Sequence, residues 1–191
     1  MQPKQVILAS GSPRRRELLG LICQDFAVLP SGADETLRDG VPLGEEIMRL
    51  AADKARDVLG KTSGARAVIG SDTMVVLDGV PMGKPCDAAD ARRMLRALSG
   101  RTHEVLTGVA VVTDDGTVDT RLSATSVTFY ELTDDEIARY VATGEPLDKA
   151  GAYGIQGRGA LLVQSIQGDY YSVMGLPVAL LARMLRAADV I

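Results

Sequence analysis

The sequence contains little of several residue types, and each shortage argues against a class of protein. Its 191 residues include two cysteines, Cys23 and Cys86, which are too few for a disulfide framework. A single histidine leaves no set of nitrogen and sulfur ligands for a zinc site. Aromatic residues make up only 4% and the net charge is −4, so neither a stacking platform nor a basic face for a nucleic-acid polymer is predicted.

Long apolar runs are also missing. The first apolar stretch, residues 6–9, is too short for the apolar region of a signal peptide. No other run approaches the roughly 18 residues of a membrane span. We therefore expect a cytoplasmic protein with reduced thiols and no membrane contact. The apolar fraction of 46% and the charged fraction of 24% are typical of a folded domain that needs no crosslink to form a core.

Segments typical of strands and helices alternate along the chain. The strands are expected at residues 6–9, 26–29, 67–70, 74–77, 103–112 and 118–129, with hairpin turns at 78–79 and 114–116. Helices are expected after the N-caps Ser12, Asp87 and Thr133, over residues 47–59, and from Pro177 onward. The pattern predicts an α/β fold, one domain over residues 1–191, with a mixed and partly antiparallel sheet.

The segment that joins the first strand to the first helix is the most informative. Pro13 suits the first helical position, so the three arginines at 14–16 fall in the first turn. Each cation there opposes the helix dipole by about 0.3–1 kcal/mol, and a bound polyanion would reverse that sign. With Ser10 and Ser12 as further contacts, the segment resembles a phosphate cradle. The alternative is a solvated basic patch that pairs with Glu17.

Two short segments supply further charged candidates. Residues 70–73 follow an apolar strand, and we expect Asp72 at the end of that strand, where a carboxylate can hold Mg²⁺ or accept a proton from water. The alternative is an ordinary surface turn. Glu35 and Asp72 suit a hard ion, meaning Mg²⁺ or Mn²⁺. Lys84 stands between turn residues in a segment that lacks the Ser or Thr of a Walker A loop.

Residues 148–160 form a glycine-rich segment. Glycines at 151, 154, 157 and 159 permit close approach of the backbone to a ligand, although their spacing is not that of the dinucleotide fingerprint. A flexible loop is the alternative, but such a loop would be more polar than a segment that includes Tyr153 and Ile155. His103 is expected to be a strand residue with a local hydrogen bond rather than a catalyst.

Taken together and in order, these segments resemble the Maf family over nearly the whole chain. The matching blocks are residues 10–15, 34–35, 70–73, 83–85, 98–100, 107–109, 144–146, 148–157 and 175–177. Ser71 departs from the family, which commonly has alanine there. The resemblance implies the fold of inosine triphosphate pyrophosphatases: an elongated mixed sheet flanked by helices, with two lobes and a central cleft for the nucleotide.

The resemblance also implies an activity. Maf proteins of this kind hydrolyse nucleoside triphosphates, namely dTTP, UTP and related or modified pyrimidine nucleotides, to the monophosphate and pyrophosphate with Mg²⁺, Mn²⁺ or Co²⁺. Asp72 matches the residue that activates water for attack on the α-phosphate. The other matching positions are Glu35 for the metal, Lys54, Lys84 and Lys149 for the triphosphate, and Arg14, Thr73 and Gln156 for base choice, beside Ser10, Ser12 and Arg15 in the cradle.

Three alternatives stay open from the residues. A competing subfamily hydrolyses 7-methyl-GTP, but it lacks the 152–157 string found here. The Gln156 amide fits the edge of uracil or thymine and, when flipped, that of cytosine, so it does not exclude CTP. A protein of another class, a regulator that binds a division protein, is suggested by the family's name, which comes from inhibition of septum formation. The sequence leaves open whether the chain forms a homodimer.

Overall fold

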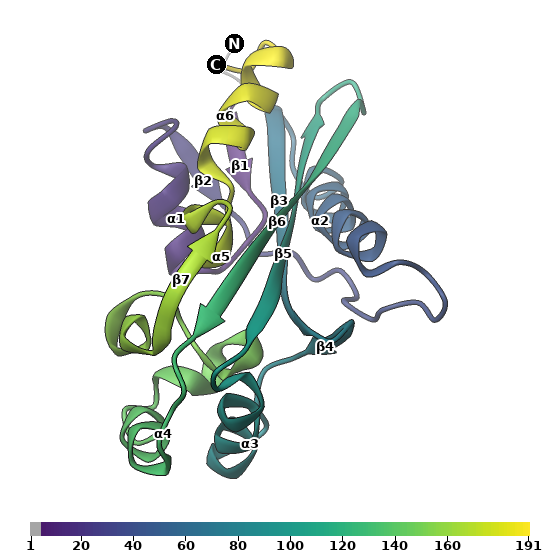
Figure 1. Ribbon diagram of the computed structural model, residues 1–191. Helices are drawn as coiled ribbons and strands as arrows, with labels where there is room; N and C mark the ends of the chain where they lie inside the picture. Colours follow the sequence, from purple (N-terminus) through teal and green to yellow (C-terminus); the bar gives the residue numbers. More distant parts are fainter. Residues whose placement is uncertain (1–4) are drawn as a thin grey trace. The chain divides into compact units, whose positions relative to one another are not determined.

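The computed structural model describes residues 5–191, in which seven strands form one sheet (Figure 1). Their order is β2-β1-β3-β5-β6-β7, with β4 beside β3. Parallel pairing joins β1 to both β2 and β3, whereas β4 is antiparallel to β3 and β7 is antiparallel to β6. The expected mixed sheet is therefore confirmed. The strands are β1 (Gln5–Leu8), β2 (Phe26–Val28), β3 (Ala65–Leu77), β4 (Val80–Met82), β5 (Thr102–Thr113), β6 (Val118–Phe129) and β7 (Val163–Gln167).

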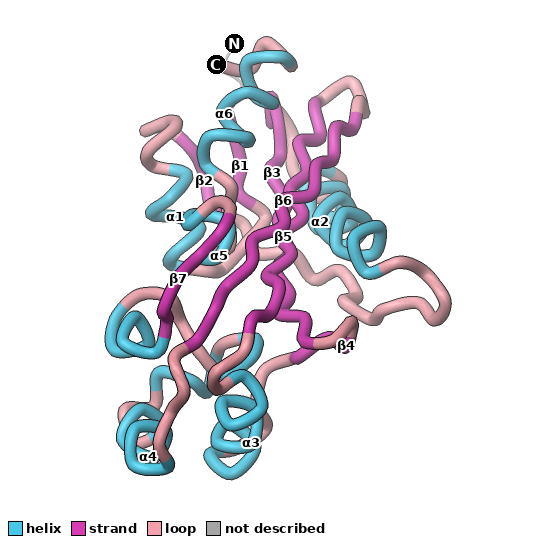
Figure 2. Tube along the Cα trace, viewed as in Figure 1, coloured by secondary structure: helices cyan, strands magenta, loops and turns pink. Residues whose placement is uncertain are grey.

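Helices connect most of the strands, as Figure 2 shows in cyan and magenta. The α-helices are α1 (Pro13–Leu19), α2 (Leu43–Leu59), α3 (Ala88–Leu98), α4 (Asp134–Val141), α5 (Tyr170–Met174) and α6 (Val178–Ala187). Three 3₁₀ turns, η1 (Glu145–Asp148), η2 (Ala150–Ala152) and η3 (Gly157–Leu162), occupy the glycine-rich region. None of the helices among residues 5–191 has the length and apolar character that a membrane span requires.

The local signals for helix starts and hairpins are confirmed. The side chains of Ser12, Asp87 and Thr133 cap α1, α3 and α4, and Thr133 forms a complete capping box with Glu136. The turns at 78–79 and 114–116 join β3 to β4 and β5 to β6. The sequence did not predict β7, whose side chains are largely exposed, or α5, which has only five residues.

One expectation about the strands is wrong. Residues 67–70 and 74–77 were expected to be two strands, but they belong to the single strand β3, so Asp72 lies in the middle of a strand rather than at its end. The polar residues 71–73 interrupt the apolar pattern without interrupting the strand. Ser71 is fully buried there, and its hydroxyl is hydrogen-bonded, so it can lie inside the sheet.

The chain divides into two compact units. The first consists of the chain up to Asp72, together with Thr107–Ser123 and Gly175–Ile191, and the second consists of Thr73–Leu106 and Ala124–Met174. In the first unit, α2 lies on one side of the strands, and α1 and α6 lie on the other (Figure 1). The second unit has a hydrophobic core to which α3 contributes Leu95 and α4 contributes Tyr140. Phe129 and Tyr153 belong to the same core.

Two glycines bring α2 unusually close to the sheet of the first unit. A Cβ atom on Gly70 would lie 1.9 Å from the carbonyl oxygen of Ala51, and one on Gly108 would lie 2.5 Å from that of Ile47. Such distances leave no room for a side chain. The backbone of α2 therefore rests directly on β3 and β5, and this contact positions the side chains described next.

Candidate active site

An ammonium group lies between two carboxylates in the first unit. Lys54 Nζ is 2.6 Å from Glu35 Oε1 and 2.7 Å from Asp72 Oδ1. The Lys54 side chain is only 9% exposed, whereas Glu35 is 65% exposed. The Asp72 side chain is 13% exposed, so the lysine and Asp72 are largely inside the protein and Glu35 meets them from the solvent side.

The alternation of β3 explains why Asp72 meets α2. Successive side chains of a strand point to opposite faces, so Gly70 and Asp72 share one face. Gly70 lies against Ala51, and Lys54 follows Ala51 by three residues, which places it on the same side of the helix. The missing side chain at Gly70 thus allows the close approach that joins Lys54 to Asp72.

Ser71 points to the other face of β3 and joins a second set of contacts. Its Oγ lies 3.0 Å from the Gly108 oxygen and 2.8 Å from the Gly175 oxygen. Arg15 Nε also donates to Gly175 O, at 2.9 Å, and Arg15 Nη1 donates to Ser10 Oγ at 3.2 Å. The start of α1, the middle of β3 and the segment before α6 are therefore linked through one carbonyl.

Arg15 is half-buried in a charged environment. Burial lowers the pKa of the Arg15 guanidinium, while the charges of Asp72 and Glu35 act in the opposite direction. The neighbouring Arg14 lowers that pKa further. Arg15 thus interacts electrostatically with Asp72 and Glu35. This part of the first unit therefore contains two cations, Arg15 and Lys54, beside the two carboxylates.

The turn before α1 has the predicted form. Ser12 Oγ accepts from the Arg15 backbone N–H at 3.5 Å, and Ser12 N donates to Ser10 Oγ at 3.3 Å. One expectation changes, however. From the sequence, Arg15 was expected only to oppose the helix dipole in the free protein. In the structure its guanidinium is anchored on Gly175 and Ser10.

The carboxylates of this region fit a divalent cation of the magnesium type. Among residues 5–191 no group of three or more His, Cys, Asp or Glu side chains gathers as a ligand cluster. Glu35 and Asp72 nevertheless share one cation already, the Lys54 ammonium, so their oxygens converge on a common position. Mg²⁺ commonly binds to one or two carboxylates and completes its shell with water and substrate phosphates. This donor set matches that description.

The remaining candidates lie in the second unit. Lys149 Nζ donates to the Glu145 carbonyl and to Asp148 Oδ1, both at 2.5 Å. The N–H of Gly151 donates to Gly83 O at 3.0 Å, which ties the glycine-rich segment to the turn that carries Lys84. Gln156, Lys84 and Thr73 belong to the same unit; the first two are exposed and Thr73 is half-buried.

The glycine-rich segment is anchored rather than loose. Ala152 and Tyr153 belong to the core of the second unit, and Gly151 and Ala152 both have positive φ, of 67° and 59°. The Tyr153 hydroxyl lies 2.7 Å from His103 Nε2, and both side chains are buried. His103 is thus a strand residue, as expected, but its hydrogen-bond partner is 50 positions away rather than local.

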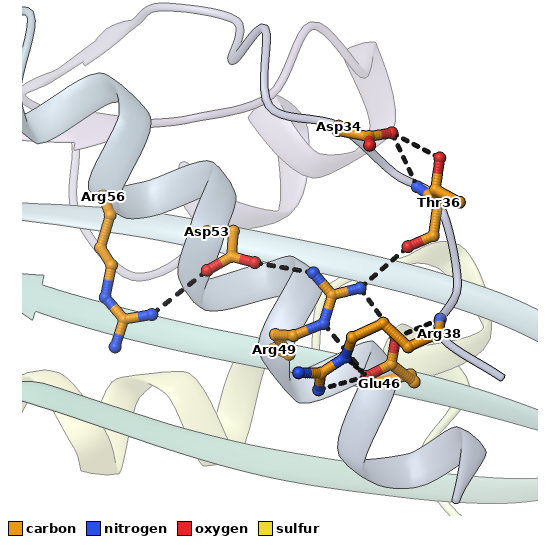
Figure 3. Close-up of polar contacts among 7 residues, drawn as sticks. All are labelled: Asp34, Thr36, Arg38, Glu46, Arg49, Asp53 and Arg56. Carbon is orange, nitrogen blue, oxygen red and sulfur yellow. Dashed lines mark hydrogen bonds and ion pairs between the residues drawn. The ribbon is translucent and has the colours of Figure 1, made fainter. Parts of the chain in front are cut away.

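Sequence analysis missed a buried carboxylate beside this site. Glu46, on α2, has no solvent exposure and accepts hydrogen bonds from Arg38 and Arg49 (Figure 3). A signal existed, because Glu46 and Lys54 both fall on the apolar face of the helix defined by Ile47, Leu50 and Ala51. A charged residue on such a face needs a partner, and both have one.

The family of the chain follows from its similarity to known proteins. Residues 5–188 match the family model described as Maf-like protein. The chain belongs to the Maf family. Among Maf relatives, a Bacillus cytotoxicus protein named dTTP/UTP pyrophosphatase is 53% identical over 97% of this chain and 96% of its own length. A protein of the same name from Bacillus mycoides is 50% identical over the same shares of the two chains.

Solved structures show the same fold at low sequence identity. The Ham1 protein of Staphylococcus aureus aligns with a TM-score of 0.56 and 16% identity, over 96% of this chain and 99% of that one. A HAM1 protein from Coxiella burnetii aligns with a TM-score of 0.51 and 14% identity, over the same shares. This Maf chain therefore has the expected fold, that of Ham1 and inosine triphosphate pyrophosphatase-like proteins.

Proposed function

We propose that the protein is a metal-dependent pyrophosphatase of dTTP, UTP and related or modified pyrimidine nucleoside triphosphates. The observation that carries the proposal is the Lys54 ammonium shared between Glu35 and Asp72. These ion pairs support the proposal, because they bring together two carboxylates and a cation, the groups that the proposed reaction requires. Relatives about 50% identical over nearly the whole chain are named dTTP/UTP pyrophosphatase, which supports this substrate class.

In the proposed reaction, Asp72 accepts a proton from a water molecule whose oxygen attacks the α-phosphorus. The bond from that phosphorus to the oxygen bridging the α- and β-phosphates breaks, and pyrophosphate leaves with the electron pair. Glu35 and Asp72 would hold a divalent cation, Mg²⁺, Mn²⁺ or Co²⁺, which when bound supplies charge stabilisation at the phosphate oxygens. The nucleoside monophosphate is the other product.

The other candidates receive roles that follow from their charge and hydrogen-bonding groups. Arg15, Lys54, Lys84 and Lys149 offset the negative charge of the triphosphate, and Ser10 and Ser12 donate to its oxygens. Arg14, Thr73 and Gln156 discriminate the base, with the Gln156 amide offering a donor beside an acceptor for the edge of uracil or thymine.

A labelling experiment tests the proposal directly. The protein is incubated with dTTP, UTP, CTP, 7-methyl-GTP and ATP, each with Mg²⁺ or Mn²⁺, in water enriched in ¹⁸O. Attack on the α-phosphorus places ¹⁸O in dTMP and leaves pyrophosphate unlabelled. Label in pyrophosphate would mean attack at the β-phosphorus, and dTDP with orthophosphate would mean an ordinary phosphatase. Preference for 7-methyl-GTP would assign the competing subfamily, and no turnover of any nucleotide would favour the division-regulator hypothesis.

A further inference from the structure

A buried carboxylate fastens the segment that carries Glu35 to α2. We call residues 31–38 the Glu35 segment. Glu46 is fully buried and accepts from Arg49 Nη2 at 2.7 Å, from Arg38 Nε at 2.7 Å and from the Arg38 backbone N–H at 2.9 Å (Figure 3). Hydrogen bonds from Arg49 and then Arg38 hold the pKa of Glu46 well below its ordinary value. The end of the segment is therefore joined to the helix by a charged group.

Arg49 extends this contact to the backbone beside Glu35. Its Nη2 donates to the Thr36 carbonyl at 2.9 Å, and its Nη1 donates to Asp53 Oδ2 at 2.8 Å (Figure 3). Thr36 in turn donates from its backbone N–H and from Oγ1 to Asp34 Oδ1, at 2.9 and 2.6 Å. The residues on both sides of Glu35 are thus held by hydrogen bonds.

The start of the segment is fastened to the same helix farther along. Ser31 Oγ and the Gly32 N–H both donate to Asp57 Oδ2 at 2.9 Å, and Lys61 lies 2.6 Å from Asp57 Oδ1. Hydrogen bonds from Lys61, Gly32 and Ser31 lower the pKa of Asp57 to about 2. Because the start of the segment meets residue 57 and its end meets residue 46, the segment runs antiparallel to α2.

We infer that Glu46 is a positioning residue which, through Arg38 and Arg49, fixes the Glu35 segment along α2 and so sets the affinity of the site for a divalent cation. The inference rests on the proposed function, since it takes Glu35 as a metal ligand. The Glu35 side chain is 65% exposed, so packing does not hold it in place. Its position depends on the ion pair with Lys54 and on the backbone that carries it, and a segment released from α2 has to be ordered again each time a cation binds.

The test compares cation binding in variants that remove either a contact to Glu46 or an ion pair elsewhere on α2. Arg38→Met removes the side-chain contact to Glu46, and Glu46→Gln removes the charge that holds both arginines. Arg56→Met is the matched control, because Arg56 is as exposed as Arg38, 55% against 57%, but its ion pair is with Asp53 (Figure 3). Mn²⁺ binding to the free protein, without nucleotide, is measured by electron paramagnetic resonance beside thermal melts.

We expect the Kd for Mn²⁺ to rise about fivefold or more in Arg38→Met and Glu46→Gln, and to stay within about twofold in Arg56→Met, since fivefold corresponds to about one kcal/mol of binding free energy. With dTTP, excess Mn²⁺ should restore kcat in Arg38→Met, because the defect lies in holding the cation. If Glu46→Gln does not fold, Arg38→Met still decides the question, since the Arg49 contact to Glu46 remains in that variant.

Three results would overturn the inference. The first is an unchanged Mn²⁺ affinity in folded Arg38→Met, when Glu35→Gln abolishes Mn²⁺ binding. The second is a loss of turnover in Arg38→Met that excess Mn²⁺ does not restore. The third is a wild-type protein that binds no Mn²⁺. Pyrophosphate release by the wild type is scored separately. A protein that binds Mn²⁺ and responds to Arg38→Met, but releases no pyrophosphate, would refute the proposed function and leave the positioning role of Glu46 in place.

Discussion

Lys54 Nζ lies 2.7 Å from Asp72 Oδ1, and this contact joins the middle of α2 to the middle of β3. The Asp72 side chain is 13% exposed, so the carboxylate meets solvent on one side and a buried cation on the other. A carboxylate in this setting can accept a proton from a water molecule while its orientation is fixed by the protein.

Asp72→Asn should abolish most of the proposed activity without unfolding the protein. Asparagine keeps the shape and can still accept a hydrogen bond from Lys54, but it removes the proton acceptor. Loss of a general base lowers the rate by about 10²–10⁴-fold, and we expect kcat for dTTP to fall by that amount. Asp119→Asn, at a carboxylate paired with Arg121 in β6, is the control. Turnover within tenfold of the wild type in folded Asp72→Asn would assign the proton to another group.

Lys54→Met should separate cation binding from turnover. Without the ammonium, Glu35 and Asp72 face each other as like charges, and a divalent cation relieves that repulsion. We expect the free protein to bind Mn²⁺ about 3–10-fold more tightly, the scale of one partly exposed ion pair, while turnover of dTTP falls. Arg93→Met, which removes a cation paired with Asp90 on α3, is the control in Mn²⁺ titrations. Weaker Mn²⁺ binding in Lys54→Met would instead mean that the lysine orders the two carboxylates.

Gly70→Ala should disturb the same pair through the backbone. The added Cβ would lie 1.9 Å from the Ala51 carbonyl oxygen, so α2 has to move away from β3. Overpacking of this kind destabilises a protein by about 1–3 kcal/mol, and denaturant titration should show a loss in that range together with reduced turnover. Gly83→Ala is the control, because nothing lies within 4 Å of its added Cβ. An unchanged unfolding midpoint in Gly70→Ala would show that α2 shifts freely.

The sequence predicted the features that depend on neighbouring residues. The capping side chains of Ser12, Asp87 and Thr133 and the two hairpin turns follow from short patterns whose partners lie within four residues. The order of strands and helices could be predicted for the same reason, because apolar periodicity is local.

The features that sequence analysis missed depend on distant partners. The polar run at 71–73 suggested the end of a strand, but the Ser71 hydroxyl is satisfied by Gly108 and Gly175, 37 and 104 positions away. The contact between Lys54 and Asp72 likewise depends on how closely α2 approaches β3, and a glycine at position 70 does not reveal that by itself. Roles for individual residues came from the family resemblance and remain predictions.

Arg14 and Arg15 should behave differently, against the expectation from sequence that neither stabilises the free protein. Arg15→Ala removes the hydrogen bonds to Gly175 and Ser10, and a hydrogen bond to a charged group contributes about 1.5–3 kcal/mol. We therefore expect Arg15→Ala to lower the melting temperature of the free protein. Arg14→Ala should lower stability less, because its cation opposes the positive end of the α1 dipole, and should weaken nucleotide binding.

Melts with and without a non-hydrolysable dTTP analogue, at matched metal concentration, separate the two arginines. Stabilisation by the analogue should shrink in Arg14→Ala. Equal melting temperatures of Arg15→Ala and the wild type would show that the contacts to Gly175 and Ser10 contribute little to the free protein.

His103 should make the stability of the protein depend on pH. The ring is 2% exposed, and within residues 5–191 its Nδ1 has no hydrogen-bond partner. Burial lowers the pKa of His103 from 6.5 to about 4. Above pH 6.5 the ring is neutral in both the folded and unfolded states, so it adds no pH dependence. Between pH 6.5 and 4 the unfolded state binds the proton more readily, so stability falls as the pH falls, by about 3 kcal/mol in total at roughly 1.4 kcal/mol per pKa unit.

The chain has a single histidine, so its NMR signal reports this pKa without assignment. Carboxylates also titrate near pH 4, and the effect of the histidine is therefore the difference between the wild type and His103→Gln. The glutamine amide can still bond to Tyr153, whose hydroxyl lies 2.7 Å from His103 Nε2, but it does not titrate. We expect the unfolding free energy of the wild type to decline relative to that of His103→Gln from pH 6.5 to 4 and then to level off. Parallel curves, or a histidine signal that titrates near 6.5, would mean that the ring is reached by water in the folded state.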